Sequence, residues 1–385
     1  MTGERPLSGI RVLDFTRVLA GPYCTALLAD LGAEVIKVEP PAGDDYRHIG
    51  PFIGNESALF LAVNRGKRSI VLDLADAADL AVAVKLARKA DVVVENFRPG
   101  VADKLGIGWE ALSAQHPELI YASISGFGQT GPLAKRPAYD IIVQALSGIM
   151  TVTGEPDGPP TLIGESIADV VAALFGSWSI MAALVERGRT GRGRRLDIAM
   201  LDTMIALQPL VVARFLASGI APFRVGNRHP LSTPFGAFRA SDRPFVLAVL
   251  NDKLFAALTE VIGAPAAAQD PRFATDALRS ANEPAVRALI EAWSLQRRAA
   301  EAVATLAAAG VPAAGIETIA HALSSEQAAV RDPLQQMSHP TLGDIKTLEQ
   351  PVRFAGATRG GLAAAPLLDE HGAEIRAEIA RESPR

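Results

Sequence analysis

The segment Ile10-Arg11-Val12-Leu13-Asp14-Phe15 is an apolar run that predicts a buried strand. A turn at Ala20-Gly21-Pro22 follows, and the residues from Tyr23 to Leu31 predict a helix that Gly32 ends. The next predicted strand is Glu34-Val35-Ile36-Lys37-Val38-Glu39. A strand, a helix and a strand within about 30 residues form a right-handed parallel unit. The sequence therefore predicts an α/β fold.

The same alternation continues along the chain, with a strand at 69–73, a helix at 77–89, and strands at 91–95 and 119–125. This pattern predicts a Rossmann-like parallel sheet covered by helices, with ligands bound beyond the carboxyl ends of the strands. Those ends carry polar and glycine-containing segments, namely 16–21, 96–100 and 126–132.

A smaller mixed domain is predicted after this sheet. Strands at 236–239 and 245–249 precede helices around 254–262, 285–293 and 299–309. We therefore expect a large Rossmann-like domain at 1–205 completed by 330–385, a linker at 206–225 and a small α+β domain at 226–325.

Composition sets limits on the partners and the compartment. The chain has 385 residues, 49% hydrophobic and 21% charged, and its formal charge of −4 gives no electrostatic case for nucleic acid or anionic membrane as a partner. The longest apolar stretches fall short of the roughly 18 residues of a membrane span. A single cysteine, Cys24, cannot form an internal disulfide, so we expect a cytoplasmic protein. Cys24 lies in an apolar helical segment typical of an inert thiol.

Several motifs are missing. The first strand is not followed by a G-x-G-x-x-G turn, so the Rossmann-like sheet does not imply a nicotinamide cofactor. The six histidines lack metal-ligand spacing, and we expect no metal. The sequence also lacks a P-loop and a Gly-x-Ser-x-Gly elbow.

A long apolar helix is predicted from about Ser166 to Glu186. Ser166 is a natural N-cap, and Asp169 three residues later completes a capping-box-like start. The helix has almost no charge before Glu186, so we expect it to be buried nearly all round. Asp169 has two interpretations at this point. In the first, Asp169 serves only to cap the helix. In the second, the positive end of the helix keeps Asp169 ionised, so that its carboxylate can act as a nucleophile towards an acyl group.

Seven ordered motifs resemble those of the class III CoA-transferases, the family of formyl-CoA transferase and carnitine CoA-transferase. The resemblance is dense over residues 7 to about 205 and loose beyond. The motifs are Asp14-Phe15-Thr16, Ala20-Gly21-Pro22, Glu34 to Pro40, Asn64 to Ser69, Val94 to Gly100, Ser125 to Pro132, and Thr190-Gly191-Arg192-Gly193.

The resemblance implies that Asp169 is the catalytic nucleophile. It implies a CoA transfer from an acyl-CoA to a free carboxylic acid through an aspartyl anhydride and an aspartyl-CoA thioester. Coenzyme A is then a substrate, and no cofactor is bound permanently. A carboxylate suits this role because it can become an anhydride and then a thioester without ATP or metal.

The resemblance also implies binding residues. The expected contacts of CoA are Val18, Leu19, Ala20, Leu72, Asn96, Phe97, Arg98 and Lys104, with Arg98 and Lys104 as phosphate partners. Pro40 stands where formyl-CoA transferase has an arginine, so one contact is not carried over. The expected substrate contacts are Tyr139, Asp140, Arg228 and His229.

Two alternatives stay open. The family also contains 2-methylacyl-CoA racemases, which use a histidine where this chain has Tyr139, and tyrosine is a poor base with an unperturbed pKa of about 10. A non-catalytic acyl-CoA-binding protein is the other.

The resemblance further implies an interlocked homodimer in which each chain threads through its partner. Because the stretch 227–242 lacks the glycine-rich loop of formyl-CoA transferase, oxalate and formate specificity is not carried over. We expect a succinyl-CoA-type donor and a small dicarboxylate acceptor.

Overall fold

A computed structural model describes residues 5–355 and 361–381 of the chain. These residues form two compact units. Unit 1 contains residues up to Met150, Leu162–Ile220 and the residues from Asp332, and unit 2 contains Thr151–Thr161 and Ala221–Arg331. Residues 151–161, which fall within the expected range 1–205, thus group with unit 2.

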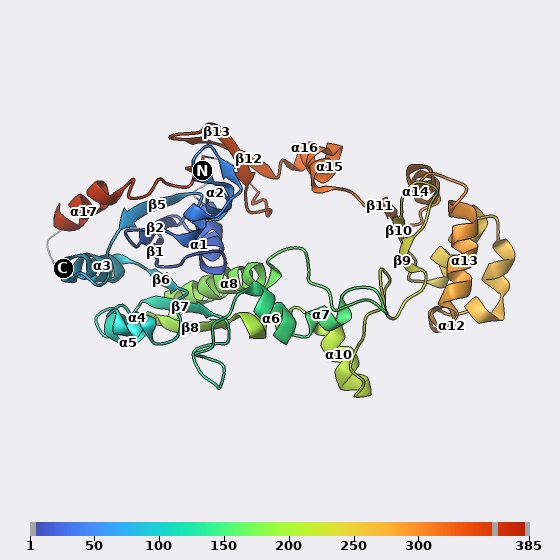
Figure 1. The fold of residues 1–385 in the computed structure, drawn as a ribbon, viewed down its shortest axis with the longest axis horizontal. Helices are drawn as coiled ribbons and strands as arrows, with labels where there is room; N and C mark the ends of the chain where they lie inside the picture. The colour runs from blue at the N-terminus through green and yellow to red at the C-terminus, as the bar shows by residue number, and fades with distance from the viewer. Residues whose placement is uncertain (1–4, 356–360, 382–385) are drawn as a thin grey trace. The chain divides into compact units, whose positions relative to one another are not determined.

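Unit 1 is built on a parallel sheet that has six strands in the described residues, in the order β5-β2-β1-β6-β7-β8 (Figure 1). The order reverses between β1 and β6, so the loops after these two strands diverge there. The predicted α/β class with a large parallel sheet is confirmed. The strands are β1 (Arg11–Asp14), β2 (Glu34–Glu39), β5 (Lys67–Val71), β6 (Val92–Glu95), β7 (Ile120–Ser125) and β8 (Arg194–Ala199).

Each face of this sheet buries a separate apolar core, because alternate residues of the strands point to opposite sides. On one face, Val12, Val94 and Ala122 pack with helices α1 (Ala20–Asp30) and α8 (Ile167–Thr190). On the other face, Leu13, Val93 and Tyr121 pack with helices α3 (Ala77–Lys89), α4 (Val101–Lys104), α5 (Trp109–Ser113) and α17 (Gly372–Arg381).

Helices α1 and α8 approach closely where Gly176 faces Cys24. A Cβ at Gly176 would lie 3.1 Å from the Cys24 Sγ, so a larger residue would require the Cys24 side chain or the helix to shift. Cys24 is fully buried, and burial raises the pKa of its thiol.

The expectation that α8 is buried nearly all round is wrong for the single chain. Leu174, Trp178 and Val185 are about half or more exposed, at 48%, 60% and 66%. By length and composition α8 could span a membrane, contrary to the estimate from the sequence, and a core helix of a soluble protein passes the same test. Its apolar residues divide between the core and an exposed stripe.

The C-terminal segment of unit 1 returns to the sheet along the edge strand β5. Gly66 N donates to Ala363 O at 2.8 Å, His371 N donates to Ser69 O at 3.0 Å, and Val71 N donates to the Asp369 carboxylate at 2.8 Å. The edge of β5 is therefore paired with the chain's own tail. The other elements of unit 1 are η1 (Asp45–His48), β3 (Phe52–Ile53), β4 (Glu56–Ser57), α2 (Ala58–Val63), α6 (Asp140–Leu146), α9 (Met200–Ala206), α10 (Pro209–Ser218), β12 (Leu334–His339) and β13 (Gly343–Leu348), with α7 (Ile149–Val152) at its boundary.

Unit 2 has an antiparallel sheet in the order β11-β10-β9 with helices packed on it. Its core includes Phe245, Leu258 and Ile290. The elements are β9 (Phe235–Phe238), β10 (Phe245–Ala248), α11 (Asp252–Val261), η2 (Pro265–Gln269), η3 (Pro271–Phe273), α12 (Asp276–Ala281), α13 (Glu283–Ser294), α14 (Ala299–Ala308), β11 (Ala313–Gly315), α15 (Ile319–Ser324) and α16 (Glu326–Arg331).

Candidate active site

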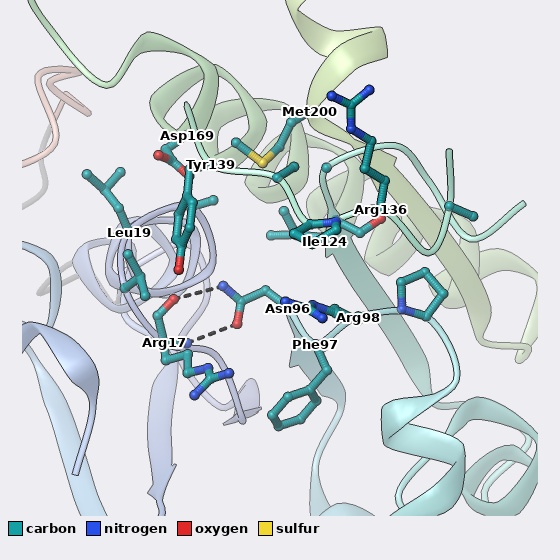
Figure 2. A pocket seen from close by; sticks show the side chains of 18 of the residues that line it. Arg17, Leu19, Asn96, Phe97, Arg98, Ile124, Arg136, Tyr139, Asp169 and Met200 are labelled. Carbon is teal, nitrogen blue, oxygen red and sulfur yellow. Dashed lines mark hydrogen bonds between the residues drawn. The ribbon is translucent and has the colours of Figure 1, made fainter. Parts of the chain in front are cut away.

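A cavity of about 190 Å³ lies beyond the carboxyl ends of the parallel strands in unit 1 (Figure 2). Loops after β1, β6 and β7 and the starts of α8 and α9 form it, so it sits where the strand order reverses. It is lined by Arg17, Val18, Leu19, Ala20, Asp45, Asn96, Phe97, Arg98, Pro99, Ile124, Ser125, Gly126, Ala134, Arg136, Pro137, Ala138, Tyr139, Asp169 and Met200.

Asp169 lies in the first turn of α8 and lines this cavity. Its carboxylate makes no hydrogen bond or ion pair with any residue in 5–355 or 361–381. The predicted capping box is therefore wrong: Asp169 does not cap, and Ser166, although it is the N-cap residue, makes no capping bond through its side chain to the described residues.

The cap comes instead from α6. Asp140 accepts a hydrogen bond from the amide of Ala168 at 2.7 Å. Gln144, one turn along α6, donates to the other oxygen of Asp140 at 2.7 Å and accepts from Ile163 N at 3.0 Å. These bonds satisfy the start of α8 from outside and leave the carboxylate of Asp169 free.

Burial raises the pKa of Asp169 to about 7, and the nearby carboxylate of Asp140 adds to the rise. The expected stabilisation of the anion by the helix end is thus outweighed by desolvation.

Hydrogen bonds join the loops after β1 and β6 across the switch in strand order. The amide of Arg17 donates to Asn96 Oδ1 at 3.0 Å, and Asn96 Nδ2 donates to Arg17 O at 2.8 Å (Figure 2). Asn96 therefore binds the backbone of the neighbouring loop while its side chain lines the cavity.

Three arginines give the cavity a positive side. Arg17 pairs with Asp45 at 3.4 Å, whereas Arg98 and Arg136 form no ion pair within the described part of the chain. An unpaired guanidinium is suited to phosphate or carboxylate groups.

Two buried polar groups lie at the strand ends. Ser125 is 8% exposed and lines the cavity, and its hydroxyl has no hydrogen-bond partner among the described residues. Glu95, at the end of β6, accepts from Phe97 N at 2.8 Å, and burial raises the pKa of Glu95 to about 7.

The sequence-predicted residues fall into three groups. Val18, Leu19, Ala20, Asn96, Phe97, Arg98 and Tyr139 line the cavity with Asp169, and Asp140 touches the start of α8. Leu72 is buried in the core and Lys104 is exposed, both outside the cavity lining. Arg228 lines a separate cavity of about 300 Å³ within unit 2, and His229 stacks on Phe235 with ring centroids 5.0 Å apart.

The predicted site residues did not include Arg136, Met200 or Ser125, all of which line the cavity. Ser125 ends a predicted strand, which was an available signal, whereas Arg136 lies in a loop without a pattern. Among the described residues, no group of three or more His, Cys, Asp or Glu side chains could hold a metal ion.

Comparison with known proteins identifies the family. The model of CoA-transferase family III matches residues 7–372. The acetyl-CoA:oxalate CoA-transferase of Acetobacter aceti is 47% identical over 381 residues, covering 97% of this chain and 96% of the relative. The succinyl-CoA:glutarate CoA-transferase of Mus musculus is 37% identical, covering 98% and 87%.

A solved structure agrees in fold. The crystal structure of a CAIB/BAIF family protein from Brucella suis has a TM-score of 0.87 and 41% identity, covering 98% of this chain and 100% of that chain. The chain therefore belongs to CoA-transferase family III and is a class III acyl-CoA:carboxylate CoA-transferase.

Proposed function

We propose that this enzyme moves CoA from a small acyl-CoA to a dicarboxylic acid, with Asp169 as the covalent nucleophile. The observation that carries the proposal is the carboxylate of Asp169, which lines the cavity, is half-buried and has no hydrogen bond or ion pair with the described residues. A carboxylate whose oxygens accept capping hydrogen bonds would be a poor nucleophile. Here Asp140 caps the helix in place of Asp169.

In the first half of the reaction, an oxygen of ionised Asp169 attacks the thioester carbonyl of the donor. The carbon–sulfur bond breaks, the CoA thiolate leaves, and a mixed anhydride forms. The thiolate then attacks the aspartyl carbonyl, which releases the donor acid and gives an Asp169–CoA thioester.

In the second half, the acceptor carboxylate attacks this thioester and displaces the CoA thiolate, giving a second anhydride. The thiolate attacks the acceptor's acyl carbon, which forms the new acyl-CoA and frees Asp169. The cycle starts and ends with one CoA thioester and one free carboxylate, so it needs no outside energy source.

The dicarboxylate acceptor is supported by the names of relatives, which include oxalate, glutarate and mesaconate transferases. Succinyl-CoA is the donor we propose first, because several of these relatives carry it in their names. The 47% identity to an acetyl-CoA:oxalate enzyme makes acetyl-CoA and oxalate the next pair to assay.

The unpaired guanidinium groups of Arg98 and Arg136 support a role in holding CoA phosphates at the cavity. Lys104, exposed at the end of α4, is proposed for a phosphate outside the cavity. Arg228 and His229 are proposed to contact the acid substrate, with Tyr139 beside Asp169.

We also propose an interlocked homodimer in the cytoplasm. The apolar helix α10 has no buried residue in the described structure, and Leu210, Phe215 and Leu216 are 64%, 47% and 76% exposed. Such a face, with the exposed stripe on α8, is suited to a second copy of the chain. Light scattering of the purified protein measures whether it is a dimer, and a monomer mass would contradict the proposed assembly.

The test of the function uses mass spectrometry of CoA exchange across a panel of acyl-CoA donors and free acids. Hydroxylamine added during turnover should convert Asp169 to a hydroxamate, and Asp169→Ala should lower exchange by roughly 10³-fold or more. The matched control is Asp202→Asn, which alters an exposed first-turn aspartate of α9 and should exchange at the normal rate. Normal exchange by Asp169→Ala would end the proposal, and exchange of an alpha proton without any acceptor acid would favour a racemase.

A further inference from the structure

Val18 has a backbone conformation that a β-branched residue rarely adopts. Its φ is +71°, in the left-handed region, and the residue lines the cavity. Such a conformation costs roughly 1–3 kcal/mol and persists only where the surroundings enforce it. The loop after β1 therefore has a shape that the sequence of the loop alone would not choose.

Two side chains from other parts of unit 1 enforce this shape. Asp44 Oδ1 accepts a hydrogen bond from Val18 N at 3.0 Å. The preceding residue, Arg17, is held on both of its backbone groups by Asn96, at 3.0 Å and 2.8 Å. The backbone of the loop is thus fixed from the β2 side and from the β6 side.

Asp44 is itself held rigidly. It is 1% exposed, and its second oxygen lies 2.8 Å from the Nζ of Lys37, which is fully buried in β2. Its amide donates to Glu39 at 3.1 Å, and Lys37 Nζ also donates to Thr16 O at 2.8 Å. The contact with the buried cation of Lys37 holds the carboxylate of Asp44 in place.

A buried ion pair of this kind adds little net stability compared with apolar residues. The position of the Lys37–Asp44 pair suggests another role for it. The Asp44 carboxylate accepts a hydrogen bond from Val18 N and another from Tyr46 N at 3.0 Å. The pair links β2 to the wall of the cavity.

We propose that Asp44, with Asn96, is a positioning residue that holds Val18 in the left-handed conformation and so pre-forms the wall of the cavity that receives the thioester end of acyl-CoA. This inference rests on the proposed function, since it takes acyl-CoA as the ligand. It predicts that Asp44 affects CoA binding through Val18 and not through contact with the ligand.

A double-mutant cycle tests this. In Asp44→Ala, Val18 is free to return to a negative φ, and regaining the binding shape should weaken CoA binding and raise KM for the acyl-CoA by roughly 10-fold. The kcat should change less than about threefold, because Asp169 is untouched. Glycine adopts a positive φ readily, so in a Val18→Gly background the same Asp44→Ala change should raise KM for the acyl-CoA by less than about threefold.

The matched control is Asp30→Ala. This change breaks the buried ion pair between Asp30 and Arg65, and neither of these residues lines the cavity. It should therefore lower Tm without changing the affinity for CoA. Asp44→Asn keeps an oxygen acceptor and should restore most of the binding. If Asp44→Ala does not fold because Lys37 is left unpaired, Lys37→Met with Asp44→Ala takes its place in both backgrounds.

Calorimetric titration with CoA and steady-state kinetics are both measured. Equal losses in the Val18 and Val18→Gly backgrounds would overturn the positioning role while leaving the transferase function intact. Wild-type protein that binds CoA and shows the coupling, yet transfers nothing, would overturn the function alone. Failure of the wild-type protein to bind CoA would overturn both.

Discussion

Asp140 holds the start of the helix that carries Asp169, accepting a hydrogen bond from the Ala168 amide at 2.7 Å. Asp169 is left without such a bond, and burial raises its pKa to about 7 with a further contribution from the charge of Asp140. Asp140 is thus structural, whereas Asp169 is free for the nucleophilic role that we propose, although both lie near the same helix end. This difference between Asp140 and Asp169 leads to measurable predictions.

The first consequence is a pH profile. In the proposed mechanism only the ionised form of Asp169 attacks, so kcat/KM should rise as the pH increases through about 7 and level off above it. Asp140→Asn removes one of the two causes of the raised pKa while keeping an oxygen for the Ala168 amide. The midpoint of its profile should move to lower pH. Identical midpoints for the two proteins would contradict this electrostatic link.

The second consequence concerns stability. Asp169 has a folded-state pKa above its unfolded value near 3.8, so the folded protein binds the proton more tightly and loses stability as the pH rises from about 4 to about 7. Asp169→Asn removes this loss and should be more stable than the wild type at pH 8 by on the order of 1–4 kcal/mol. The gain should shrink at pH 5. Urea unfolding at the two pH values measures it, and a destabilised variant at pH 8 would contradict it.

Ser125 gives a third prediction. Its hydroxyl is buried at the cavity without a hydrogen-bond partner among the described residues, which costs free energy in the absence of a ligand. Ser125→Ala should therefore leave the midpoint of unfolding unchanged or slightly higher. It should lower kcat/KM by roughly 10-fold, because a hydrogen bond to bound substrate is lost. An unchanged kcat/KM would show that the hydroxyl does not contact the substrate.

The fourth prediction concerns Arg98 and Arg136, which line the cavity. Arg98→Ala and Arg136→Ala should each raise KM for acyl-CoA by roughly 10-fold, since hydrogen bonds to charged groups contribute about 1.5–3 kcal/mol. Raising the salt concentration should reduce the difference from the wild type. Arg272→Ala, which removes an exposed cation paired with Asp270 in unit 2, is the control and should bind acyl-CoA normally. Equal KM values for all of these proteins would contradict a phosphate role.

The sequence was most informative where the structure depends on local patterns. Apolar runs such as Val12–Leu13 and Val92–Val94 predicted the parallel sheet, and the polar segments after the strands predicted which loops line the cavity. The sheet forms because these runs bury both faces, a property that each run carries by itself.

The capping of α8 could not be predicted in this way. Ser166 and Asp169 have the spacing of a capping box, but the bond that caps the helix comes from Asp140, which is distant in sequence. The same is true of Val18, whose conformation depends on Asp44. Long-range hydrogen bonds outweighed the local preference at both places, and both places lie at the candidate site.

The pairing of the chain's tail with β5 has a consequence for handling the protein. A bare strand edge is a template on which other chains assemble, and this protein conceals one such edge with residues 363–371. At the opposite edge of the sheet, β8 begins with the exposed charges of Arg194 and Arg195, which discourage unwanted partners. Versions of the chain shortened from the carboxyl terminus into this segment should consequently aggregate, even though every residue of the active-site cavity is retained.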